Sequence, residues 1–261
     1  MSVRLALVLL AALTASAASA TATIPFTVSL ETEAAGIQNS TSGFSAVGVE
    51  RFNARATGAG QNFTSNFGGN DFTGRYTGVQ INRADRFGGA GGNGKYAVTF
   101  SSAGYSLDLA ATTGKVTYFG FWLSALDRGN QVSFLKGGET LFTFTASDAR
   151  SFINGLPNRA SYSCNPNAAF ANQNCGEPYA FLNFYARGGA SFDRIVFAEN
   201  PQVGGYESDN HTVGRWNRIS GTPIDITGTV AGVPEPSSWA MLIAGFGLVG
   251  AGMRRRRTAI A

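Results

Sequence analysis

A few side chains in this 261-residue chain are of types that could do chemistry. Asp209, His211 and the many serines are the residue types of a hydrolase triad, but the sequence has no G-x-S-x-G nucleophile elbow and only one histidine. Gly89 to Gly94 (GAGGNG) has the glycine spacing of a dinucleotide-binding loop, yet a strand pattern follows where such a loop needs a helix. We therefore expect a surface loop at 89–94, a strand-end residue at His211, and no catalytic residue.

Four other polar residues could bind a metal ion. Calcium prefers hard oxygen ligands, and such oxygens are carried by Asp127, Asn130, Glu207 and Asp209. Their spacing is not that of an EF-hand loop, so polar turn residues are the alternative interpretation. A structural calcium ion is the one cofactor that the sequence leaves open.

Aromatic rings could bind a sugar, because their faces stack on the apolar faces of pyranose rings. Tyr105, Trp122 and Trp216 are the rings that the sequence nominates. For Trp122 a core position is the favoured alternative, since it lies in an apolar stretch.

Cys164 and Cys175 are the only cysteines. Two cysteines that close a short loop in an exported protein predict a disulfide, and the turn-forming residues around them place it in a surface loop. A zinc site is the weaker alternative, because two thiolates are too few and His211 is far away in sequence.

The elements that position these residues are predicted to be strands. Alternating apolar and polar residues indicate strands, with 115–124 apolar on both faces and therefore central, and with Gly137-Gly138 as a two-residue hairpin. One short helix is expected at 147–154, and 52–94 is expected to be long loops with a strand only at 77–83. The further strands are predicted at 24–30, 96–100, 131–135, 140–146, 178–186, 191–199 and 205–212. This pattern predicts an all-β fold, a β-sandwich or jelly roll, over residues 23–230.

Both ends of the chain are predicted to be targeting segments. Residues 1–22 have the charge, apolar core and A-x-A sites of a signal peptide, with an uncleaved anchor as the alternative. In 231–261, an extended PEP tripeptide precedes an apolar helix at about 238–253 and the block Arg254–Arg257, which places the C-terminus in the cytoplasm. Without these segments the domain holds 15 basic and 15 acidic residues, so we expect no nucleic-acid partner.

The tail resembles the PEP-CTERM sorting signal in its PEPxxWA variant, and an ordinary membrane anchor is the alternative. The resemblance rests on the order and spacing of Pro234, Glu235, Pro236, Trp239, Ala240, Arg254, Arg255, Arg256 and Arg257. It implies export in a Gram-negative bacterium, retention in the inner membrane with the domain in the periplasm, and processing near the PEP motif by an exosortase.

A second, looser resemblance covers residues 94–213. Tyr118–Asp127, Phe192–Phe197 and Tyr206–Asn210 are similar to segments of exosortase-dependent surface proteins with a β-sandwich ectodomain. It implies a non-catalytic protein of the cell surface or extracellular matrix, associated with exopolysaccharide. A secreted carbohydrate-active hydrolase on the same scaffold is the alternative, because paired carboxylates could come from distant strands.

Overall fold

A computed structural model describes residues 25–31 and 40–224. They form antiparallel strands with one α-helix, α1 (Ala146–Gly155), and three short 3₁₀ helices, η1 (Ala90–Gly92), η2 (Arg159–Tyr162) and η3 (Ala168–Phe170). The strands are β1 (Phe26–Glu31), β2 (Gly43–Glu50), β3 (Gly58–Ser65), β4 (Phe72–Arg83), β5 (Lys95–Thr99), β6 (Tyr105–Ala111), β7 (Tyr118–Ser124), β8 (Asn130–Lys136), β9 (Glu139–Thr145), β10 (Ala180–Ala186), β11 (Arg194–Glu199), β12 (Tyr206–Arg218) and β13 (Thr222–Ile224). The all-β prediction is confirmed.

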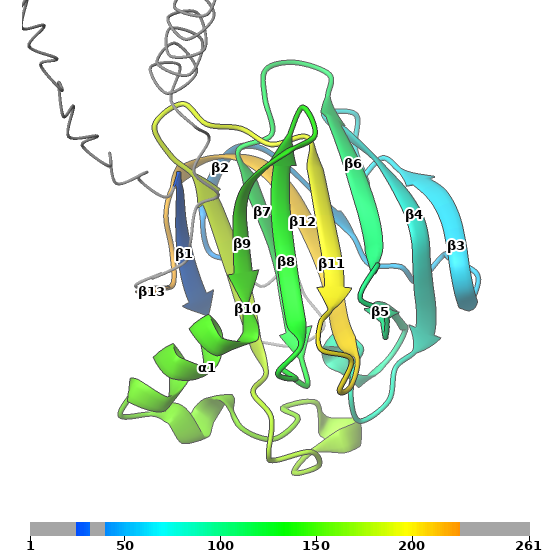
Figure 1. Cartoon of the computed structure of the whole chain (residues 1–261), viewed down its shortest axis with the longest axis vertical. Helices are drawn as coiled ribbons and strands as arrows, with labels where there is room; N and C mark the ends of the chain where they lie inside the picture. The colour runs from blue at the N-terminus through cyan, green and yellow to red at the C-terminus, as the bar shows by residue number, and fades with distance from the viewer. Residues whose placement is uncertain (1–24, 32–39, 225–261) are drawn as a thin grey trace, which may run out of the picture.

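These strands form one continuous sheet that curls over itself. Its order is β13-β1-β10-β7-β12-β5-β4-β6-β11-β8-β9, while β2 pairs with β12 and β3 pairs with β4. In Figure 1 the β11-β8-β9 end lies in front of β10, β7 and β12. Phenylalanine rings join the two layers, with centroids 4.9 Å apart for Phe26 and Phe134 and 5.2 Å apart for Phe121 and Phe197. The result is a sandwich made from a single sheet.

Strand β7 is central, as its sequence predicts. It pairs with β10 on one side and β12 on the other, and all of its residues are buried. Phe119 and Phe121 belong to the main core between the layers, whereas Trp122 packs on the opposite face with Tyr179 and Ala90. An apolar strand of this kind is buried on both faces because loops cover its outer side.

Two local predictions are also confirmed. Gly137 and Gly138 have φ angles of 59° and 89°, and Lys136 pairs with Glu139, so the β8–β9 hairpin closes with two residues in the left-handed region. Helix α1 follows directly and is capped by Thr145, whose backbone N–H donates to the Asp148 carboxylate at 3.0 Å.

The prediction for residues 52–94 was wrong in part. The segment contains β3 and the whole of β4, which pair with each other. Gly78 in β4 has a φ of 78°, and the pairing register with β3 shifts beside it. The buried residues on either side, Tyr76 and Val79, are therefore three positions apart instead of two. This irregularity disrupts the alternation by which a strand is recognised in a sequence.

Among the described residues no helix is long and apolar enough to cross a membrane. The predicted signal peptide, the PEP motif, the apolar helix at about 238–253 and the arginine block lie outside the described residues.

Candidate functional site

The sorting segment follows the last strand of the sheet closely. Strand β13 pairs with β1, with Ile224 opposite Val28, and lies at an edge of the sheet. Pro234 is ten residues after Ile224 in the chain. A fully extended chain of ten residues spans at most roughly 33–36 Å. The folded domain therefore stays within that distance of the PEP motif for as long as the chain is intact.

Three of the four predicted calcium ligands lie at one end of the sheet. Asp127 accepts the Gly205 backbone N–H at 3.1 Å, and the Asn130 amide donates to the Gly205 carbonyl at 2.9 Å and to the Glu199 carboxylate at 2.8 Å. Glu207 is two residues from Gly205 and is buried. Sequence reasoning missed Glu199, because no local pattern connects it with Asn130.

Asp209 lies apart from these ligands. It accepts the backbone N–H of Ala90 in η1 at 2.9 Å and that of Asn210 at 2.6 Å. The four predicted ligands thus do not form one group, and within 25–31 and 40–224 no set of three or more His, Cys, Asp or Glu side chains is arranged to hold a metal ion.

Burial raises the pKa of the carboxyl groups in this region. The pKa of Asp127 rises to about 6, first through burial and then through the charge of Glu177 and a hydrogen bond to it. Burial raises the pKa of Glu207 well above its ordinary value, and the charge of Asp127 adds to this effect. Glu207 Oε2 is buried without a hydrogen-bond partner. For Asp209, burial outweighs the two N–H donors and raises the pKa to about 8.

The predicted sugar-binding rings do not form a platform. Tyr105 is 2% exposed and Trp122 is fully buried, so neither ring presents a face to solvent. Tyr105 instead stacks on Phe197 in the core, with ring centroids 4.9 Å apart. Trp216 is half-buried, and the Arg187 guanidinium lies over its ring at 5.5 Å.

His211 is not a strand-end residue, contrary to the sequence prediction. It lies inside β12 with its side chain in the core, bonded to the Tyr76 hydroxyl at 3.1 Å and to Ser208 Oγ at 3.0 Å. Burial lowers its pKa to about 3, so the imidazole is neutral at physiological pH. Ser208 and His211 are both fully buried, so no substrate reaches this pair unless the core opens.

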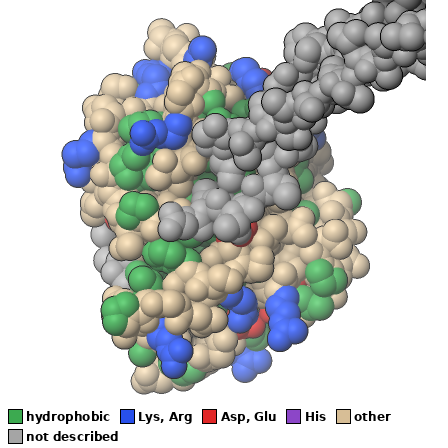
Figure 2. Space-filling view, turned by 60° about the vertical axis from the view of Figure 1, so that its left-hand side comes forward, with side chains coloured by type: hydrophobic (Ala, Val, Ile, Leu, Met, Phe, Trp, Pro, Cys, Tyr) green, Lys and Arg blue, Asp and Glu red, His purple; other side chains and the backbone are tan. Residues whose placement is uncertain are grey.

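The charged side chains outside this region are dispersed. On the face in Figure 2, Lys and Arg side chains lie at several separate positions, some of them beside Asp or Glu side chains. Two of the exposed cations pair with acids, Lys136 with Asp193 at 3.1 Å and Arg194 with Asp108 at 3.2 Å.

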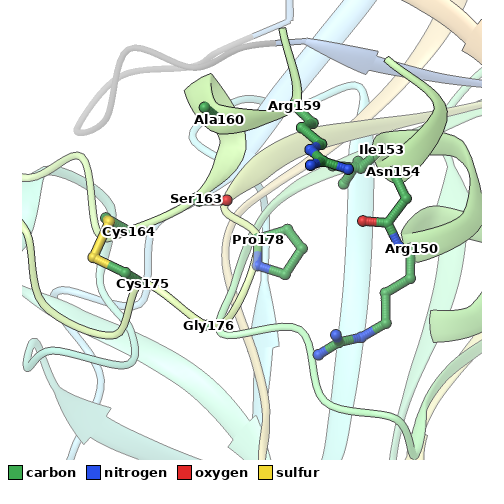
Figure 3. Close-up of a pocket in the computed structure, with 10 residues that line it drawn as sticks. All are labelled: Arg150, Ile153, Asn154, Arg159, Ala160, Ser163, Cys164, Cys175, Gly176 and Pro178. Atoms are coloured by element: carbon green, nitrogen blue, oxygen red, sulfur yellow. A yellow bond between two sulfur atoms is a disulfide. The ribbon is translucent and has the colours of Figure 1, made fainter. Parts of the chain in front are cut away.

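The predicted disulfide is confirmed and borders a cavity. Cys164 and Cys175 are bonded, and the loop they close is also held by a β-bridge between Ser163 and Pro178. Beside the bond is a cavity of about 390 Å³ (Figure 3), which α1 and the segment after it line on the other side. No sequence motif pointed to this cavity.

The tail matches a known protein family. Residues 232–257 fit the family described as the PEP-CTERM protein-sorting motif, which agrees with the residues of the predicted sorting signal. No curated protein and no solved structure matches the chain. The match shows that the tail carries the PEP-CTERM sorting motif, and this motif implies an exported, exosortase-dependent surface protein.

Proposed function

We propose that this protein is a non-catalytic component of the cell surface or extracellular matrix. Its tail holds it in the inner membrane, an exosortase then processes it near Pro234–Pro236, and the domain associates with exopolysaccharide. The observation that carries the proposal is the sorting motif at 232–257, which begins within ten residues of the end of the folded sheet. The proposal involves no cofactor.

The burial of the candidate catalytic residues supports a non-catalytic role. Ser208 and His211 are enclosed by the core and bond to tyrosine hydroxyls and to each other, which is typical of a polar network that fixes a fold. The carboxyl groups of Glu207 and Asp209 are likewise buried. A hydrolase would need such groups at an accessible surface.

The proposal is tested by the mass of the mature protein. We expect the protein from cells with the exosortase to lack Arg254–Arg257, and the protein from cells without the enzyme to retain them. A Pro234→Ala, Pro236→Ala double variant should be processed more slowly, because the extended conformation of the motif is no longer enforced. Pro157→Ala, outside the motif, serves as the matched control.

Retention of the arginine block in both strains would disprove processing. Equal processing of the double variant and the control would show that the exosortase does not recognise the two prolines.

A further inference from the structure

The cavity beside the disulfide has walls from three segments of the chain. Helix α1 contributes Arg150, Ile153 and Asn154, which the i, i+3, i+4 spacing places on one helix face. The segment after the helix contributes Arg159 and Ser163, and Pro178 and the disulfide close the opposite side. Figure 3 shows Arg159 and Asn154 on one side of Pro178 and the two cysteines on the other. A volume of about 390 Å³ lies in the range of small-molecule sites, roughly 300–1,000 Å³.

The charged residues that line this cavity are both arginines. Glu177 lies between two lining residues, Gly176 and Pro178, but its carboxyl group bonds to Asp127 and is not part of the lining. Arg159 is exposed. A cavity with two guanidinium groups and no lining carboxylate favours an anionic ligand.

Arg150 is held in place by contacts outside the cavity. Its Nη2 donates to the Leu126 carbonyl, and its charge acts on Asp127. Its Nε is buried and has no hydrogen-bond partner. Because this Nε is closed off from solvent, Arg150 acts on a ligand in the cavity through its positive charge and not through this N–H. Guanidinium groups bind carboxylates through paired, nearly parallel hydrogen bonds, which makes a carboxylate the best match.

The other walls are suited to a sugar ring. The Asn154 amide and the Ser163 hydroxyl both donate and accept hydrogen bonds, as sugar hydroxyls require. Pro178, Ile153 and the disulfide provide apolar surface opposite these groups. The disulfide, the Ser163–Pro178 bridge and the capped helix fix the walls before any ligand arrives, which lowers the entropy cost of binding.

We propose that this cavity binds a carboxylate-bearing sugar unit, such as the uronic acid residue of an acidic polysaccharide. The inference rests on the proposed association with exopolysaccharide and names the chemical class that the domain would recognise. Arg159 holds the carboxylate, Arg150 adds positive charge to the cavity wall, and Asn154 and Ser163 contact the hydroxyl groups.

The test is a titration of the exported protein, purified from cells that express the full chain. Glucuronic acid, glucose and inorganic phosphate are added in turn, and binding is followed by the amide NMR signals of α1 and of the disulfide loop. We expect glucuronic acid to shift these signals at concentrations at least about tenfold lower than glucose, because loss of one charge-assisted bidentate contact costs about tenfold or more.

Variants localise the effect to the cavity. Arg159→Gln removes an exposed cation from the lining and should weaken glucuronic acid binding about tenfold, with an unchanged melting temperature. Arg83→Gln removes an exposed arginine at the end of β4 and should leave the affinity unchanged within about twofold.

Three outcomes would overturn the inference. They are equal binding of glucose and glucuronic acid, binding of phosphate as tight as that of glucuronic acid, and an equal effect of the two variants. Each is independent of the mass measurement, so the cavity assignment can fail while exosortase processing stands.

Discussion

At the scale of single residues, burial acts in opposite directions on the acids and on the histidine. Raised carboxyl pKa values, about 6 for Asp127 and about 8 for Asp209, mean that the folded state binds more protons than the unfolded state. Their stabilising contribution is complete below about pH 4 and is lost as the pH rises through 6 to 8. His211, lowered to about 3, contributes stability above pH 6.5 that is lost on acidification. The two effects oppose each other between about pH 4 and 6.5.

Glu207 allows the carboxyl effect to be measured. Burial raises its folded-state pKa well above the ordinary 4.5, so its ionisation as the pH rises places a charge without a hydrogen-bond partner at Oε2 in the protein interior. We expect Glu207→Gln to match the wild type near pH 5 and to become the more stable protein at higher pH. The difference in free energy of unfolding should grow by up to about 1.4 kcal/mol per pH unit.

Urea unfolding from pH 5 to 9 measures this difference. Glu139→Gln, an exposed carboxylate in β9, is the control and should follow the wild type throughout. Wild-type and Glu207→Gln curves that stay parallel would show that Glu207 does not titrate anomalously.

At the scale of elements, glycines permit turns for two different reasons. Gly137 has a φ of 59° in the β8–β9 turn, with open space where a Cβ would be. Gly104, before β6, has a φ of 65°, but its Cβ would overlap the Phe197 carbonyl oxygen in β11. The first site needs only the backbone conformation, whereas the second also needs the absence of a side chain.

The two glycines therefore predict different costs. Gly137→Ala should lower the free energy of unfolding by about 1–2 kcal/mol, the cost of the left-handed conformation. Gly104→Ala should cost about 3 kcal/mol or more, because β6 and β11 must also separate. Denaturant melts of both variants provide the comparison, and equal losses would mean that the backbone relaxes without cost at Gly104.

The disulfide also stabilises the structure at this scale. It closes a loop between residues 11 apart, for which the chain-entropy model gives about 3 kcal/mol. We expect the Cys164→Ser, Cys175→Ser double variant to lose about that stability, and also to lose most of its affinity for glucuronic acid because one wall of the cavity is freed. Thermal melts and the NMR titration test the two effects separately. An unchanged affinity would show that the bond has no part in forming the cavity.

At the scale of the whole molecule, the sheet organises both ends of the domain. Strands β1 and β13 are neighbours near one sheet edge, so the chain enters and leaves the described domain at adjacent positions (Figure 1). The strand pairings of the described domain are complete by Ile224. Targeting segments at either end can therefore be removed without breaking a described strand pair.

A truncation tests whether the folded domain is independent of the sorting segment. We expect deletion of residues 231–261 to leave the melting temperature of the exported domain unchanged, because the described core ends before the deletion. The truncated protein should no longer depend on the exosortase for its location, which cell fractionation with and without the enzyme would measure. Exosortase-dependent placement of the truncated protein would contradict the role of the motif.

Features that depend on near neighbours in the chain were determined by the sequence itself. The sorting motif, the Gly137-Gly138 hairpin, the central strand β7 and the Cys164–Cys175 bond each involve residues close together, so order and spacing were sufficient.

Only the tertiary structure decided which distant residues meet. The curl of the sheet buried Tyr105, loop segments covered Trp122 on the outer face, and the strand order brought Asn130 to Glu199. It also set α1 beside the disulfide loop to form the cavity. Burial and contact across a sheet depend on how strands far apart in the chain pack, and no local pattern of residue types contains that information.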